Sequence, residues 1–216
     1  MRKSFIASVA LVASGSVLGL VLVSRTLLAQ APPPASTDGP RFSAEGALER
    51  PLDYREWVYL TSGLGMTYGP TQPNAGEPRF FDNVFVNRQS YQGFLRTGRW
   101  PDKTMFILEI RQSQQKASIN NGGQTQGETV MAIEAAVKDT ARFADRGGWG
   151  YFDFGGGPGQ KAATPALPQT ERCYACHRDN TAVENTFVQF YPTLMEVARR
   201  MGTVKPTYDP NHKVSQ

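Results

Sequence analysis

The sequence is poor in the side chains that build metal cages and covalent cross-links. Its 216 residues include only two cysteines and two histidines. Two cysteines exclude a disulfide-dense scaffold, and with two histidines they make an all-protein zinc cage hard to assemble. Charged residues are also sparse, at 19% against about 25% in an average domain.

Basic charge is scarce as well once the N-terminal segment is set aside. The net charge of +4 falls to +1 without residues 1–31, because they hold three basic residues and no acid. No basic field therefore indicates a nucleic-acid partner. The 21 glycines and 15 prolines, about 17% of the chain against about 12% on average, favour turns and strands over a helical bundle.

The first 31 residues have the pattern of an export signal. A basic start is followed by an uncharged stretch over Phe5–Val23 and by small residues at Ala29 and Ala31. This pattern predicts a cleaved signal peptide and a periplasmic protein. The competing interpretation is an uncleaved membrane anchor, because the uncharged stretch nearly spans a bilayer core of ~30 Å. We expect a linker over 32–41, a single domain over 42–206 and a flexible tail over 207–216.

Runs rich in β-branched and aromatic residues predict five strands. They are Val58–Tyr68, Phe80–Val86, Thr104–Arg111, Thr129–Lys138 and Trp149–Phe154. A helix is expected over Arg88–Thr97, with Asn87 as its N-cap and Gly98 at its end. The polar stretch Gln112–Gly127 is interpreted as a solvated hairpin loop. Strands joined by turns predict an antiparallel sheet with flanking helices, an α+β fold.

A last helix is predicted where apolar residues recur with helical spacing. Pro192 suits its first turn and Gly202 its end. The spacing places Met195 and Met201 on the apolar face of this helix.

Both cysteines and one histidine fall in a single pentapeptide, Cys173-Tyr174-Ala175-Cys176-His177. This is the C-x-x-C-H pattern of covalent c-type haem attachment. Residues three apart lie on one side of a helical turn, so both thiols can reach the vinyl groups of one porphyrin. The following histidine can then place an imidazole nitrogen on the iron. The pattern predicts one haem c, held by Cys173 and Cys176 with His177 as its axial ligand.

Three other interpretations compete for this motif. A thioredoxin-like redox pair would follow a strand in a βαβ pattern, which is absent. A zinc site needs further ligands, and His212 is the one remaining cysteine or histidine. A structural disulfide leaves His177 unexplained.

The motif lies late in the chain, so few residues follow it that could be a sixth iron ligand. Met195 and Met201 are better explained as core residues, and His212 lies in the predicted tail. We therefore expect an iron whose sixth position is open or holds water.

Four segments resemble the cytochrome P-460 family, which includes the cytochromes c-prime-beta. They are YREWV at 54–58, GRWPDKTMFILE at 98–109, IEAAVKDTAR at 133–142 and the stretch from Cys173 to Val197, with Phe190-Tyr191-Pro192. The resemblance implies a mostly antiparallel β-domain with flanking helices, a five-coordinate c-type haem and commonly a homodimer.

The resemblance also separates two kinds of family member. The enzymes that oxidise hydroxylamine or nitric oxide bond a lysine to the porphyrin edge, in a pattern like D-x-T-x-x-x-K-E. The matching stretch here is Asp102–Glu109, and Leu108 stands in the place of the lysine. Leucine cannot form that bond, and Lys103 is expected on the opposite strand face. This favours the c-prime-beta type, whose haem is not cross-linked.

Strand alternation suggests which other side chains face the haem. Phe106, Leu108 and Ile110 share one face, and an ordinary sheet core would explain this nearly as well. Glu134 has small face-mates and matches a pocket glutamate of the family's enzymes. It is either a proton relay or a carboxylate paired with an arginine. Phe187 follows the motif and is predicted to contact the haem or the core.

These observations predict a periplasmic mono-haem cytochrome that binds nitric oxide or carbon monoxide. One alternative is an enzyme that oxidises hydroxylamine or nitric oxide, or has peroxidase-like activity, with Glu134 moving protons. The other is a simple electron carrier. A redox partner and a homodimer are further expectations.

Overall fold

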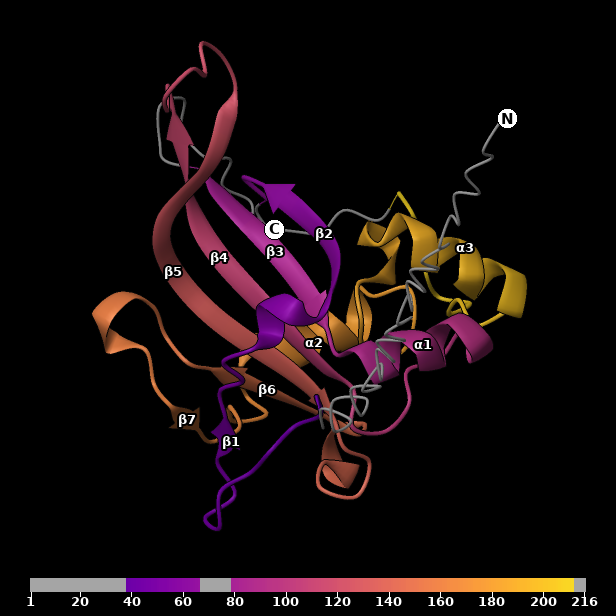
Figure 1. Cartoon of the computed structure of the whole chain (residues 1–216). Coiled ribbons are helices and arrows are strands. Elements are labelled where there is room, and N and C mark those ends of the chain that lie inside the picture. The colour runs from indigo at the N-terminus through magenta and orange to yellow at the C-terminus, as the bar shows by residue number, and fades with distance from the viewer. Residues whose placement is uncertain (1–37, 67–78, 212–216) are drawn as a thin grey trace, which may run out of the picture. The chain divides into compact units, whose positions relative to one another are not determined.

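Five antiparallel strands form the main sheet, in the order β2–β3–β4–β5–β6 (Figure 1). The computed structural model describes residues 38–66 and 79–211. The predicted signal peptide, most of the linker and His212 lie outside the described residues. The strands are β2 Val58–Leu64, β3 Phe80–Val86, β4 Met105–Gln115, β5 Gln124–Lys138 and β6 Trp149–Asp153. The predicted α+β fold with an antiparallel sheet is confirmed.

A second, two-stranded sheet was not predicted from the sequence. It pairs β1 Leu48–Glu49 with β7 Ala163–Thr164. Two residues are too short a run for alternation to be visible. Four short 3₁₀ turns complete the connections: η1 Tyr54–Glu56, η2 Ala144–Arg146, η3 Gly157–Gly159 and η4 Val188–Phe190.

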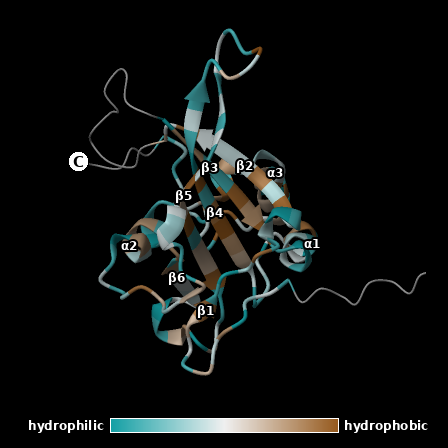
Figure 2. Cartoon of the chain, turned by 60° about the vertical axis from the view of Figure 1, so that its left-hand side comes forward, coloured by the Kyte–Doolittle hydropathy of each residue, from teal (hydrophilic) through white to brown (hydrophobic). Residues whose placement is uncertain are grey.

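The polar stretch between β4 and β5 is mostly strand, so its prediction as a loop over Gln112–Gly127 is wrong in extent. Ser113 pairs with Gln126 and Gln115 pairs with Gln124, which leaves only residues 116–123 as the loop. Backbone hydrogen bonds extend the ladder although neither face of this part is apolar. The strand ends of the hairpin are accordingly hydrophilic, although its tip carries an apolar segment (Figure 2).

Side chains alternate across the sheet and build one core on each face. One face carries three helices: α1 Arg88–Thr97, α2 Arg172–Asp179 and α3 Pro192–Met201. Its core includes Phe106, Trp149 and Tyr151 from the strands with Phe94 and Leu194 from the helices. We call this the helix face. The other face, the back face, packs Ile107, Ile133 and Phe152 against Leu48 and Tyr54.

Helix α1 has the predicted bounds but not the predicted N-terminal cap. The Asn87 side chain makes no capping bond; it accepts a hydrogen bond from Met105 N and donates one to Lys103 O. Asp38 accepts the hydrogen bond from Arg88 N instead, at 2.6 Å. The cap therefore comes from a residue 50 positions upstream, which local sequence cannot show.

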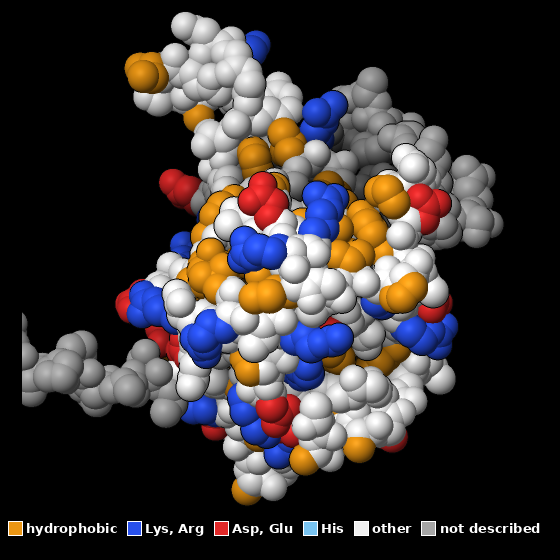
Figure 3. Space-filling view, turned by 90° about the vertical axis from the view of Figure 1, so that its right-hand side faces the viewer, with side chains coloured by type: hydrophobic (Ala, Val, Ile, Leu, Met, Phe, Trp, Pro, Cys, Tyr) orange, Lys and Arg blue, Asp and Glu red, His pale blue; other side chains and the backbone are white. Residues whose placement is uncertain are grey.

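Both helix ends at glycine are as predicted. Gly98 and Gly202 end α1 and α3 with φ of 68° and 65°, the left-handed region that glycine adopts without strain. The side of the molecule that carries α1 and α3 shows many lysine and arginine side chains, interspersed with apolar and acidic ones (Figure 3). No helix among the described residues is long and apolar enough to cross a bilayer.

Candidate haem site

The C-x-x-C-H motif forms most of helix α2. Cys173 and Cys176 lie one turn apart, and both thiols are free and partly buried. Burial raises the pKa of the Cys173 thiol. The helical spacing that the sequence predicted is therefore present, with His177 directly after the second cysteine.

His177 is held in the tautomer that a metal ligand needs. Its Nδ1 lies 2.8 Å from the backbone oxygen of Asn185. A carbonyl oxygen can only accept, so Nδ1 carries the proton and Nε2 keeps its lone pair. Burial lowers the pKa of the imidazole to about 4, against the opposing effect of the Asn185 bond. The ring is thus neutral at physiological pH, as iron coordination requires.

Two aromatic rings fix the orientation of the imidazole. Tyr151 of β6 lies with its ring centroid 4.5 Å from that of His177, and Phe187 approaches edge-on at 4.7 Å. Tyr151 is 4% exposed, and its hydroxyl has no hydrogen-bond partner among the described residues. Burial raises the pKa of this phenol, so the hydroxyl remains a donor. A buried hydroxyl without a partner costs free energy unless a bound group supplies an acceptor.

A cavity of about 550 Å³ lies between α2 and the helix face of the sheet. Such a volume is typical of cofactor sites, and most of its exposed lining is apolar. Seven residues that the sequence proposed for the site line this cavity: Phe106, Leu108, Glu134, Cys173, Cys176, His177 and Phe187. Ile110, which shares the strand face of Phe106 and Leu108, does not line it. Phe190 and Tyr191 line it as well. The structure brings the predicted site together, while the roles of these residues stay predictions.

The sheet supplies an apolar wall of this cavity. Leu108 lies between Val84 of β3 and Glu134 of β5, each directly opposite it in register. Phe106, two residues along the same face, is 6% exposed and stacks on Tyr191. Lys103 precedes β4 and binds Asp139 through its Nζ at 2.5 Å, which keeps its amine engaged outside the cavity.

Glu134 is not paired with an arginine, which removes one of the two predicted roles within the described residues. It forms no hydrogen bond or ion pair there, although it is largely buried. Burial raises the pKa of its carboxyl, and the negative charges of Asp153 and Asp82 raise it further.

Asp82 and Met66 are among the cavity residues that the sequence did not indicate. Asp82 lies on the cavity side of β3, two positions from Val84, and burial raises its pKa to about 6. A charged residue on an otherwise apolar strand face was the signal that could have revealed it. Met66 also lines the cavity, and its side chain occupies the space where a Cβ of Gly63 would lie. Its distance in sequence from the motif hid it.

The two methionines of α3 do not line this cavity. Met195 is 6% exposed and belongs to the helix-face core, as the core interpretation predicted. Met201 is 42% exposed, so its predicted place on the apolar face is wrong. It is the last residue of α3, where the helix has passed the edge of the core.

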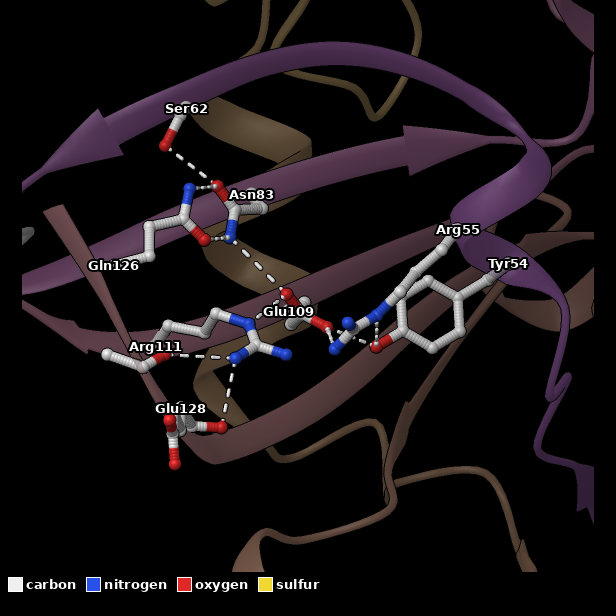
Figure 4. Close-up of polar contacts among 9 residues, drawn as sticks. Tyr54, Arg55, Ser62, Asn83, Glu109, Arg111, Gln126 and Glu128 are labelled. Atoms are coloured by element: carbon white, nitrogen blue, oxygen red, sulfur yellow. Dashed lines mark hydrogen bonds and ion pairs between the residues drawn. The ribbon is translucent and has the colours of Figure 1, made fainter.

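A second polar cluster lies on the back face of the sheet, around Glu109 (Figure 4). Glu109 is 3% exposed and accepts hydrogen bonds from the Tyr54 hydroxyl, from Arg55 Nη2 at 2.5 Å and from Arg111 Nε at 2.6 Å. Burial alone would raise the pKa of this carboxyl, but the Arg111 and Tyr54 bonds and the two cationic charges hold it below its usual value. Asn83 connects the cluster to Gln126.

The residues of the cavity fit a covalently attached haem. One helical turn presents two free thiols, and the next residue presents a neutral imidazole with a free nitrogen. Most of the surrounding wall is apolar, as a porphyrin requires, and Tyr151, whose buried hydroxyl has no partner within hydrogen-bond geometry among the described residues, belongs to the same lining.

Comparison with known families gives the same result. A family model for cytochrome P460 matches residues 51–188. The match begins just after β1 and ends at the first residue of η4. It covers more than half of the chain. The chain belongs to the cytochrome P460 family. Membership makes it a haem-binding cytochrome. No curated protein matches the chain.

Proposed function

We propose that this P460-family member is a periplasmic mono-haem c-type cytochrome that binds small neutral gases, and that it is of the c-prime-beta type. Cys173 and Cys176 would hold the haem through thioether bonds, and His177 Nε2 would be the axial ligand. When bound, the haem iron supplies a Lewis-acidic position for a diatomic ligand such as nitric oxide or carbon monoxide.

The residue at position 108 carries this proposal. Leu108 lies on the sheet wall of the cavity, where the family's oxidising enzymes have the cross-linking lysine. It can neither bond to a porphyrin edge nor donate a hydrogen bond. With Phe106 and Val84, it offers an incoming ligand an apolar surface, which favours neutral diatomics.

The fixed imidazole also supports the proposal. The backbone oxygen of Asn185 accepts a hydrogen bond from Nδ1–H of His177, which makes Nε2 more basic. The rings of Tyr151 and Phe187 restrict rotation of the imidazole. His177 therefore keeps its orientation whether or not a sixth ligand is present.

An oxidising enzyme is the second candidate, because Glu134 is a buried carboxylate without a cationic partner in the cavity. Burial raises the pKa of this carboxyl, which makes it a stronger proton acceptor than an exposed glutamate. The missing lysine argues against hydroxylamine oxidation of the family's cross-linked type.

A simple electron carrier is the third candidate, because Met66 places a thioether at the cavity. A methionine is a common sixth ligand of electron-transfer haems. If Met66 were bound to the iron, the reduced haem would be six-coordinate and carbon monoxide would bind weakly.

Expression with a haem-attachment system followed by a pyridine haemochrome assay tests the attachment. We expect one covalent haem per chain, and loss of covalent haem in Cys173→Ser with Cys176→Ser. His177→Ala should abolish the native spectrum, whereas His212→Ala, the control at the other histidine, should not change it. Carbon monoxide titration of the reduced wild type then tests gas binding. Hydroxylamine turnover with an electron acceptor would favour the enzyme instead.

A further inference from the structure

Two carboxylates share the wall of the cavity with its apolar residues. Asp82 lies opposite Ile110 and Glu134 lies opposite Leu108, so both point to the helix face from strands on either side of β4. Their strands are two strand spacings apart, about 10 Å. Neither carboxylate forms a hydrogen bond or ion pair with another described residue.

The charged groups around these carboxylates do not neutralise them fully. Helix α2 contributes Arg172, Cys173, Cys176 and His177 to the lining, and of these only Arg172 is cationic at neutral pH. Strand β6 contributes Tyr151, whose phenol stays protonated because burial raises its pKa. Tyr191, directly after η4, is also part of the lining. Asp153 lies opposite Glu134 and raises its pKa. When Asp82 and Glu134 are both ionised, the lining groups carry two negative charges and one positive charge, a net negative charge.

An independent observation points to a bound group in this cavity. The Tyr151 hydroxyl is buried, lacks a partner among the described residues and belongs to the same lining. The acidic pair thus lies beside a site built for a bound group.

We propose that Asp82 and Glu134 form a charge filter, which makes the haem site select neutral ligands and reject anions. The proposal rests on the function proposed above, in which the haem of this cavity binds a small ligand. It assigns ligand selectivity to two side chains that stand apart from the haem-attaching motif.

The physical basis is Coulomb repulsion in a cavity that water screens poorly. At an effective dielectric near 20, a unit charge about 10 Å from an anion lowers its affinity on the order of tenfold. A neutral gas carries no net charge and does not experience this penalty. Because burial raises the pKa of Asp82 to about 6, the penalty from Asp82 should be present at pH 8 and largely absent at pH 5.

The test compares an anionic and a neutral ligand on the haem-loaded full chain. Azide is titrated against the ferric protein and carbon monoxide against the ferrous protein, at pH 5 and pH 8, by absorption spectroscopy. The variants are Asp82→Asn and Glu134→Gln, with Glu196→Gln as the control because Glu196 is exposed on α3. Comparing variant with wild type at one pH cancels the protonation of azide itself.

We expect Asp82→Asn to bind azide about tenfold more tightly than the wild type at pH 8. At pH 5 the two proteins should differ by less than about threefold, and Glu196→Gln should match the wild type at both pH values. Glu134→Gln should also tighten azide binding at pH 8, which keeps the test valid if Asp82→Asn does not fold. Carbon monoxide affinity should change far less than azide affinity in either variant.

Two results would overturn the filter. One is unchanged azide affinity at pH 8 in both variants. The other is an equal change for azide and carbon monoxide, which would mean that the carboxylates shape the cavity and do not filter charge. Failure of the wild type to bind carbon monoxide at all is a different result, because it would refute the proposed function.

Discussion

Neighbouring residues of β4 and β5 place buried carboxylates on opposite faces of the sheet, in opposite surroundings. On the back face, Glu109 is held by Tyr54, Arg55 and Arg111, and its pKa is lowered. On the helix face, Glu134 has no such partner, and its pKa is raised. The back face compensates its acid with hydrogen bonds and two cationic partners, whereas the helix face leaves its acid without them beside the cavity.

The difference shows which side of the sheet is organised for stability and which for binding. Folding favours a buried carboxylate only when charge and hydrogen bonds compensate its desolvation. An uncompensated carboxylate beside a cavity costs stability, and such residues are typical of functional sites.

The largest contrast is expected between Ile107 and Leu108, adjacent residues that face opposite sides. Ile107 is 0% exposed in the back-face core, so Ile107→Ala should lower the free energy of unfolding by about 3–4 kcal/mol. Leu108 lines the cavity and is only partly buried, so Leu108→Ala should cost only about 1 kcal/mol. Urea unfolding of the haem-loaded variants measures both. Equal costs would mean that the helix face is packed like the back face.

The sequence predicted the helices and strands more fully than the contacts between residues that lie far apart in the chain. Alternation assigned Phe106 and Leu108 to one face of β4 and gave Glu134 small face-mates on β5, because side-chain direction in a strand is a local property. The C-x-x-C-H spacing likewise located the helical turn of α2 and the residue beside it. These predictions depended on nearby residues only.

Contacts between distant residues were not predictable in the same way. The cap of α1 comes from Asp38, and the bond that fixes His177 comes from the backbone oxygen of Asn185, which carries no sequence signal. Glu109 appeared in the sequence only as part of a family motif. Tyr54 and Arg55 reach Glu109 because η1 folds against the back face of the sheet. Arg111 lies two residues along β4 from Glu109 and binds it from the same strand.

The second prediction concerns Glu109, the carboxylate whose charge is compensated on the back face. Glu109→Gln should destabilise the protein by about 2–3 kcal/mol at pH 7, because Arg111 keeps its charge and loses its anionic partner. Since the folded pKa of Glu109 is lowered, its contribution exists above the unfolded value of about 4.3 and is lost as pH falls through the folded value.

Denaturant unfolding of this variant at several pH values is the measurement. Glu128→Gln is the matched control, because Arg111 binds only the backbone oxygen of Glu128. A Glu109→Gln variant as stable as this control would show that the cluster contributes nothing.

The third prediction removes an uncompensated charge from the helix face. Asp82→Asn should raise the free energy of unfolding by about 1 kcal/mol at pH 7.5, allowing for the solvent that reaches this side chain. Because burial raises the folded pKa of Asp82 to about 6, its cost is absent below the unfolded value of about 3.9 and grows until pH passes 6. Unfolding curves at pH 4 and pH 7.5 should therefore differ less in the variant than in the wild type. A destabilised variant at pH 7.5 would reveal a stabilising partner for Asp82.

The smallest effect is expected at the edge of the back-face cluster. Gln126 is exposed and exchanges two hydrogen bonds with Asn83, at 2.8 and 3.0 Å. Gln126→Ala should cost about 0.5–1 kcal/mol and should leave the haem absorption spectrum unchanged. A spectral change would show that the two faces are coupled through the sheet.

The helix face is proposed to hold a haem with an accessible sixth position. The coordination state of the reduced haem shows whether it does. The measurement is the absorption spectrum of the reduced wild type with and without carbon monoxide, beside Met66→Leu as a check on the cavity methionine. The account predicts a five-coordinate, high-spin spectrum that carbon monoxide converts fully and that Met66→Leu leaves unchanged. A six-coordinate, low-spin spectrum that ignores carbon monoxide, and that becomes high-spin in Met66→Leu, would contradict it.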